Sequence, residues 1–172
     1  MKPTSIVIFA AVLVSACAAP ARVEVPATLK PESNESLQRI VRATGVQIYE
    51  CRAKKDANAR FEWAFVAPEA DLFDARGNKV GKHGAGPYWQ ASDGSRIVGT
   101  LKQRADAPVS GAIPWLLLTA KSNGPQGSFS NVTSIQRVNT TGGIAPARNC
   151  GSDTTGSTSR IPYTADYYFF TN

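Results

Sequence analysis

Short alternating stretches of apolar and polar residues, separated by turn residues, limit this chain to a fold built from strands. Residues 61–66 are typical, with Phe61, Trp63 and Phe65 on one face. Clusters of Gly, Pro, Asn, Asp and Ser bound each stretch, and no long helical pattern alternates with the strands. We expect further strands at 46–51, 72–74, 96–101, 115–120, 132–138 and 163–170.

These segments predict an all-β, single-domain fold. Short strands joined by turns favour a sandwich or a barrel-like double sheet, and we expect an antiparallel β-sandwich. At most one short helix is expected, over 35–43, where Leu37, Ile40 and Val41 share a helical face. The composition, 42% hydrophobic, is sufficient for a packed core.

The first residues have the pattern of an export signal. A positive Lys2 precedes the apolar run 6–14, which is too short to span a bilayer and ends in Val-Ser-Ala before Cys17. This ending resembles the bacterial lipoprotein lipobox, which implies a signal peptide at 1–16 and lipidation of Cys17. The alternative is an incidental cysteine in a signal peptide that is cut elsewhere.

The lipobox resemblance divides the chain into three parts. Residues 1–16 would be removed, 17–32 would form a lipid anchor and tether, and 33–172 would form the β domain. Ala18 follows the cysteine, and by resemblance to Gram-negative sorting rules this implies an outer-membrane lipoprotein facing the periplasm or the cell surface. The expected partner is therefore the membrane, through the acyl chains.

Charge and cysteine content limit the other partners. The formal net charge is +6, and the basic residues clustered between Arg52 and Arg60 are diluted by acidic neighbours, so we expect no nucleic-acid binding. Apart from Cys17, the chain has Cys51 and Cys150, which an exported protein would join as a disulfide. The alternative is two separate buried thiols. With a single histidine, no metal site is expected, and no cofactor either.

Six phrases together resemble one family, DUF3455, over almost the whole chain from Gly45 onward. The family has no established activity, so the resemblance implies no substrate. The phrases are GVQIYEC at 45–51, FVAPEADLFD at 65–74, GKHGAGPYWQASDGS at 81–95, AIPWLLL at 112–118, VTSIQRVNTTGG at 132–143 and PYTADYYFF at 162–170.

The segment 83–95 is the most unusual part of the chain. The glycines at 81, 84 and 86 have the spacing G-x-x-G-x-G and lead into Pro87 rather than a helix, which argues against dinucleotide binding. One interpretation is a glycine loop plus an Asp-Gly hairpin, with Trp89 in the core. The other is one wall of a ligand site, with candidate residues His83, Tyr88, Trp89 and Asp93.

No complete catalytic constellation is present. The chain lacks a G-x-S-x-G elbow, His83 with Asp93 or Asp166 could supply an acid–base pair, and no pair of carboxylates has a context that marks it for glycoside hydrolysis. Asp166 lies in an aromatic strand, where we expect it to bond to backbone amides or to an arginine such as Arg137. We therefore expect a non-enzymatic binding or structural module for an envelope glycan, lipid or protein. The alternative is an exported hydrolase that uses His83 and Asp93.

Overall fold

The computed structural model describes residues 23–55 and 60–172. Within these residues, eight antiparallel strands follow one another around a closed barrel, from β1 to β8. The strands are β1 (Ser36–Ala53), β2 (Phe61–Phe73), β3 (Lys79–Gly84), β4 (Tyr88–Ala91), β5 (Arg96–Ala105), β6 (Trp115–Ser122), β7 (Ser134–Gly142) and β8 (Thr158–Thr171). Two short 3-10 helices, η1 (Ala27–Leu29) and η2 (Ser152–Thr154), complete the described elements.

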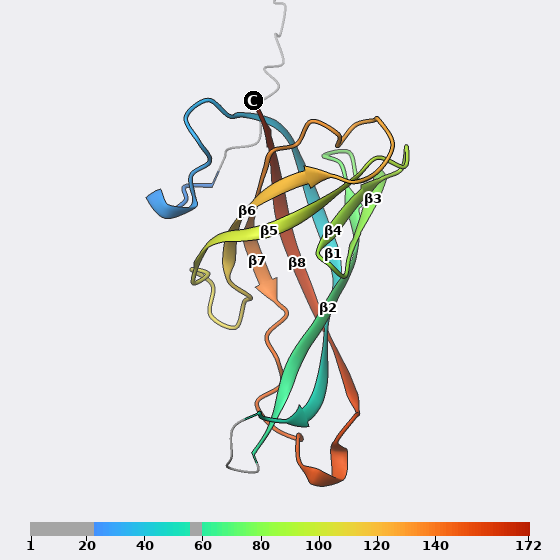
Figure 1. Cartoon of the computed structure of the whole chain (residues 1–172). Helices are drawn as coiled ribbons and strands as arrows, with labels where there is room; N and C mark the ends of the chain where they lie inside the picture. Colours follow the sequence, from blue (N-terminus) through green and yellow to red (C-terminus); the bar gives the residue numbers. More distant parts are fainter. Residues whose placement is uncertain (1–22, 56–59) are drawn as a thin grey trace, which may run out of the picture.

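The antiparallel all-β architecture is confirmed, but the strands do not stack as the two sheets of a sandwich. The long strand β1 pairs with β2 along one edge and with β8 along the other, so a single sheet closes on itself. The same three strands continue past the barrel into an arm, at whose far end η2 lies (Figure 1). A disulfide between Cys51 and Cys150 ties this arm together, with an S–S distance of 2.05 Å.

The helix expected over 35–43 is wrong, because these residues form the first half of β1. A register shift between Leu37 and Arg39 interrupts the alternation of the strand. Leu37 and Ile40 therefore contact the outer apolar cluster, while Val41 belongs to the barrel core. The bulge produces the i, i+3, i+4 spacing that is typical of a helix.

The end of strand β8, residues 167–170, is buried on both faces and consists of aromatic residues. Tyr167 and Phe169 point into the barrel core. Tyr168 and Phe170 belong to an outer cluster that also contains Trp115, Leu117 and Leu29 of η1. The described part of the expected tether, 23–32, therefore packs against the outside of the barrel. The side chain of Gln136 fixes it there by donating a hydrogen bond to the Leu29 carbonyl oxygen at 2.6 Å.

Candidate functional site

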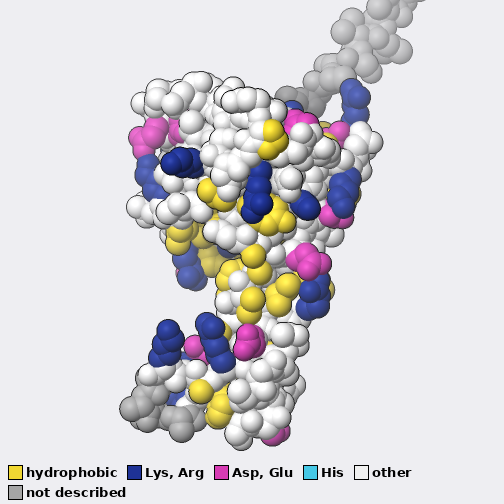
Figure 2. Space-filling view, turned by 45° about the vertical axis from the view of Figure 1, so that its right-hand side comes forward, with side chains coloured by type: hydrophobic (Ala, Val, Ile, Leu, Met, Phe, Trp, Pro, Cys, Tyr) yellow, Lys and Arg dark blue, Asp and Glu magenta, His cyan; other side chains and the backbone are white. Residues whose placement is uncertain are grey.

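The inner cavity is a space of about 300 Å³ at the end of the barrel nearest the arm. This volume lies at the lower end of the range typical of small-molecule sites. Exposed side chains of Phe65 and Val66 stand at its rim, and Figure 2 shows hydrophobic side chains gathered where the molecule narrows toward the arm. Its wall comes from seven strands, all but β5, and from the β3–β4 turn: Gln47, Phe65, Val66, Pro68, His83, Gly86, Pro87, Trp89, Leu116, Leu118, Arg137 and Tyr167.

His83 forms part of the wall of the inner cavity and is only 4% exposed. Its ring stacks on Trp89 with centroids 4.3 Å apart and meets Tyr167 edge-on. Burial lowers the pKa of His83 to about 3, against the opposing effect of its hydrogen bond to the Tyr88 carbonyl. The ring is therefore neutral at physiological pH.

The hydrogen bond of His83 also assigns its tautomer. Nδ1 lies 2.7 Å from the Tyr88 carbonyl oxygen, which can only accept, so Nδ1 carries the proton. Nε2 of the neutral ring is then an acceptor. Within the described residues Nε2 makes no hydrogen bond to the protein.

Three polar atoms on the wall of the inner cavity lack a hydrogen-bond partner among the described residues. They are Nε2 of Gln47, Nε1 of Trp89 and the hydroxyl of Tyr167. All three residues are 2% exposed or less, so water does not replace the missing partners freely. Burial raises the pKa of the Tyr167 phenol, which therefore stays protonated and able to donate. The cavity wall thus carries unused donors.

Arg137 brings a positive charge to the same wall. Its Nε and Nη2 both donate to the Pro114 carbonyl oxygen, at 3.1 and 2.8 Å, which holds the guanidinium in place. Within the described part of the chain no carboxylate lies within 4.0 Å of it. Its charge lowers the pKa of His83 and opposes the burial that raises the pKa of Tyr167, so it faces both rings.

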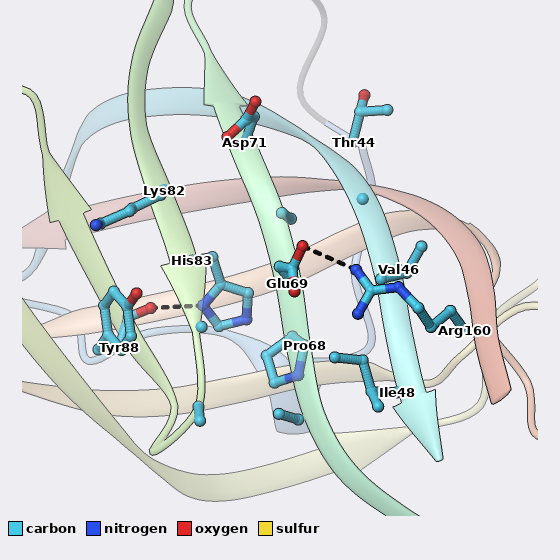
Figure 3. Close-up of a pocket in the computed structure, with 15 residues that line it drawn as sticks. Thr44, Val46, Ile48, Pro68, Glu69, Asp71, Lys82, His83, Tyr88 and Arg160 are labelled. Carbon is cyan, nitrogen blue, oxygen red and sulfur yellow. Dashed lines mark hydrogen bonds and ion pairs between the residues drawn. The ribbon is translucent and has the colours of Figure 1, made fainter. Parts of the chain in front are cut away.

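A second space, the outer groove, lies between β1, β2 and β3 and shares His83 and Pro68 with the inner cavity (Figure 3). It is larger, about 560 Å³, and carries more charged side chains. Two of its acids already have cationic partners: Glu69 pairs with Arg160 at 2.8 Å and Asp71 with Lys79 at 2.6 Å. This pairing leaves the outer groove with less unused binding capacity than the inner cavity.

The four candidate residues at 83–95 do not form one site. His83 and Trp89 line the inner cavity, whereas Tyr88 lines the outer groove and packs under the Arg96 guanidinium, 4.0 Å from its ring centroid. Asp93 lies beyond the other end of β4 and lines neither space. The proposed His83–Asp93 pair is therefore not assembled.

Asp93 joins two loops through hydrogen bonds. Its carboxylate accepts hydrogen bonds from the backbone N–H and hydroxyl of both Ser95 and Ser128. These bonds, those of Ser128 first, hold the pKa of the Asp93 carboxyl well below its usual value. The turn at 92–95 is thereby tied to the loop after β6.

Asp166 also has a structural environment. Its carboxylate accepts a hydrogen bond from Asn139 Nδ2 at 2.8 Å and lies 4.0 Å from the guanidinium of Arg42. The expected arginine contact exists, but the partner is Arg42 on the neighbouring strand. The prediction of Arg137 as the partner of Asp166 is wrong, because Arg137 lines the inner cavity and donates hydrogen bonds to the Pro114 carbonyl oxygen.

Among the described residues, no three His, Cys, Asp or Glu side chains gather in a way that could hold a metal ion. None of the helices in the same residues is long and apolar enough to cross a membrane.

The fold and the inner cavity define a closed antiparallel β-barrel protein with a partly enclosed, mostly apolar cavity at one end. The chain belongs to the DUF3455 family, described as "Protein of unknown function", whose sequence profile matches residues 31–171. The resemblance in the sequence is thus confirmed. No curated protein matches the chain.

Sequence reasoning identified His83 and Trp89 but missed the rest of the inner cavity. Gln47, Leu116, Arg137 and Tyr167 come from four strands far apart in the sequence. The one available signal was the alternation of β7, which places Arg137 on the same face as the core residue Ile135. A charged residue on the buried face of a strand is uncommon and could have marked the site.

Proposed function

We propose that this protein is a lipid-anchored component of the cell envelope whose inner cavity binds a small, largely apolar molecule without chemical turnover. The observation that carries the proposal is the combination of an apolar wall with buried, unpartnered polar atoms on Gln47, Trp89 and Tyr167. Unpaired buried polar groups cost about 1–3 kcal/mol each, and a ligand that pairs with them recovers this cost.

Binding accounts for the cavity better than catalysis does. The one histidine is buried and neutral, and Asp93 is occupied by two serines outside the cavity. The hydrolase alternative needs His83 and Asp93 within hydrogen-bond reach of a common substrate, and the geometry does not support this. A glycan chain or a protein remains an alternative partner predicted from the sequence, but the size and apolar wall of the inner cavity favour a small molecule.

Membrane attachment rests on the sequence pattern that ends at Cys17, which lies outside the described residues together with the signal peptide 1–16. The Cys51–Cys150 disulfide is compatible with an oxidising compartment. Mass spectrometry of the mature protein isolated from membranes tests the anchor. The proposal expects an acylated Cys17 at the N-terminus, and an unmodified Cys17 would disprove lipid anchoring.

Ligand binding is tested with N-phenyl-1-naphthylamine, an uncharged apolar fluorophore, added to the mature full-length protein. The expected result is saturable fluorescence enhancement that Leu116→Trp abolishes by filling the inner cavity. The matched control is Leu101→Trp, because Leu101 is 56% exposed and lies outside the cavity wall. Far-ultraviolet circular dichroism checks that both variants fold. Equal binding to both folded variants would contradict the proposal.

A further inference from the structure

The inner cavity has an excess of hydrogen-bond donors over acceptors. The guanidinium of Arg137, the amide of Gln47 and the indole N–H of Trp89 all reach its wall, and the latter two have no acceptor among the described residues. Two nitrogens of Arg137 donate to one backbone carbonyl oxygen, that of Pro114, which does not neutralise the charge of the guanidinium. Unpaired charge in a partly buried position is unfavourable unless a counter-charge arrives.

The neighbouring groups cannot supply this counter-charge. Burial keeps the phenols of Tyr163 and Tyr167 protonated by raising their pKa values, and His83 is neutral. The two acids that line the outer groove, Glu69 and Asp71, are paired with Arg160 and Lys79. Among the described residues the site therefore carries one positive charge in excess, which an anion would balance.

We propose that the ligand of the inner cavity is a small monoanion, a carboxylate on an apolar or aromatic body, whose charged group bonds to Arg137 and Gln47. The inference rests on the proposed binding function and adds the chemical class of the ligand. An arginine guanidinium matches a carboxylate in shape as well as charge. The apolar body would lie against Trp89, Leu116 and Leu118.

Two fluorophores with the same carbon skeleton test this assignment. One is the uncharged N-phenyl-1-naphthylamine, and the other is 8-anilinonaphthalene-1-sulfonate, which adds a single anionic group. We expect the mature protein to bind the sulfonate at least about tenfold more tightly than the uncharged probe, because a hydrogen bond to a charged group contributes a free energy of that size. A simple monocarboxylate, benzoate, should displace the sulfonate, and benzyl alcohol should not.

Variants then locate the anionic group. Arg137→Gln should lower the affinity for the sulfonate by a larger factor than the affinity for the uncharged probe, so that the preference for the sulfonate is lost. Because Arg137 also supports the Pro114 carbonyl, Gln47→Leu is the second variant. It removes the Nε2 donor of Gln47, and it should likewise lower the affinity for the sulfonate by a larger factor than the affinity for the uncharged probe.

The outcomes separate the two proposals. If neither probe binds to a cavity that Leu116→Trp blocks, the binding function fails, and the anionic ligand fails with it. If both probes bind there with equal affinity, or if folded Arg137→Gln and Gln47→Leu keep the preference for the sulfonate, the binding function stands and the anionic class is wrong.

Discussion

His83 and Trp89 are stacked in the barrel, with ring centroids 4.3 Å apart and planes 18° from parallel. They face each other directly across the β3–β4 ladder. A positively charged imidazolium is excluded from this position because burial opposes the charge. The stack thus links the pH of the medium to the stability of the barrel.

The first prediction concerns acid stability. The pKa of His83 is about 3 in the folded protein and 6.5 when exposed, so between these values the unfolded chain binds a proton that the folded protein does not. Stability therefore falls as the pH falls below 6.5, by about 1.4 kcal/mol per unit and about 2 kcal/mol from pH 7 to pH 5. The His83→Gln protein has no titrating side chain at this position, so its free energy of unfolding should fall by correspondingly less between the two pH values. Urea unfolding of both proteins at the two pH values measures the difference, and parallel losses would contradict the prediction.

The second prediction concerns the disulfide of the arm. Cys51 and Cys150 are separated by 99 residues, and closing a loop of this length contributes on the order of 4–5 kcal/mol in the chain-entropy model. The double variant Cys51→Ala, Cys150→Ala should therefore unfold at lower urea concentration. Adding a reductant should shift the wild-type midpoint toward that of the double variant, whose own midpoint should not move. A wild-type midpoint insensitive to complete reduction would refute this role.

The third prediction concerns the space that Trp89 occupies. A Cβ added to Gly99 would lie 2.8 Å from Trp89 Cζ3, closer than real Cβ contacts, and 3.1 Å from Leu118 Cδ2, tighter than most of them. Gly99→Ala should displace the indole into the inner cavity and destabilise the barrel by about 1–3 kcal/mol. Thr100→Ala, at the exposed neighbouring position of β5, is the control. Near-ultraviolet circular dichroism reports the environment of the Trp89 ring, and urea unfolding reports stability. Identical spectra and identical unfolding midpoints for both variants would count against the prediction.

The fourth prediction separates Asp93 from ligand binding. Asp93→Ala removes the acceptor for Ser95 and Ser128, so the β4–β5 turn should loosen and the melting temperature should fall. Because Asp93 does not line the inner cavity, binding of N-phenyl-1-naphthylamine should not change. Loss of probe binding by a folded Asp93→Ala protein would restore Asp93 to the ligand site.

Several elements could be predicted from local residue patterns. The alternation of Phe61, Trp63 and Phe65 lies within β2, and the doubly apolar end of the chain is β8, between β7 and β1. The polar stretch between Lys54 and Arg60 joins β1 to β2. These patterns work because side chains alternate between the two faces of a strand.

The interpretation of an Asp-Gly hairpin with Trp89 in the core is confirmed by the pairing of β4 with β5, but β3 escaped prediction because glycine replaces apolar residues that would mark it. A Cβ on Gly81 would lie 2.3 Å from the Gln90 carbonyl oxygen, so the close approach of β3 and β4 requires glycine there. Glycine-rich sequence is typical of loops, and no local pattern distinguishes a loop from two strands in such close contact.

Local patterns were thus enough for the all-β character of the chain, its antiparallel order and the pairing of Cys51 with Cys150. They could not show that β1 closes the sheet by pairing with β8, because closure depends on hydrogen bonds between residues far apart in the chain. Closure alone brings Arg137, Gln47 and His83 onto one cavity wall. The alternation along a strand indicates which of these side chains share a face of that strand. Only the register between strands decides which side chains from different strands come into contact.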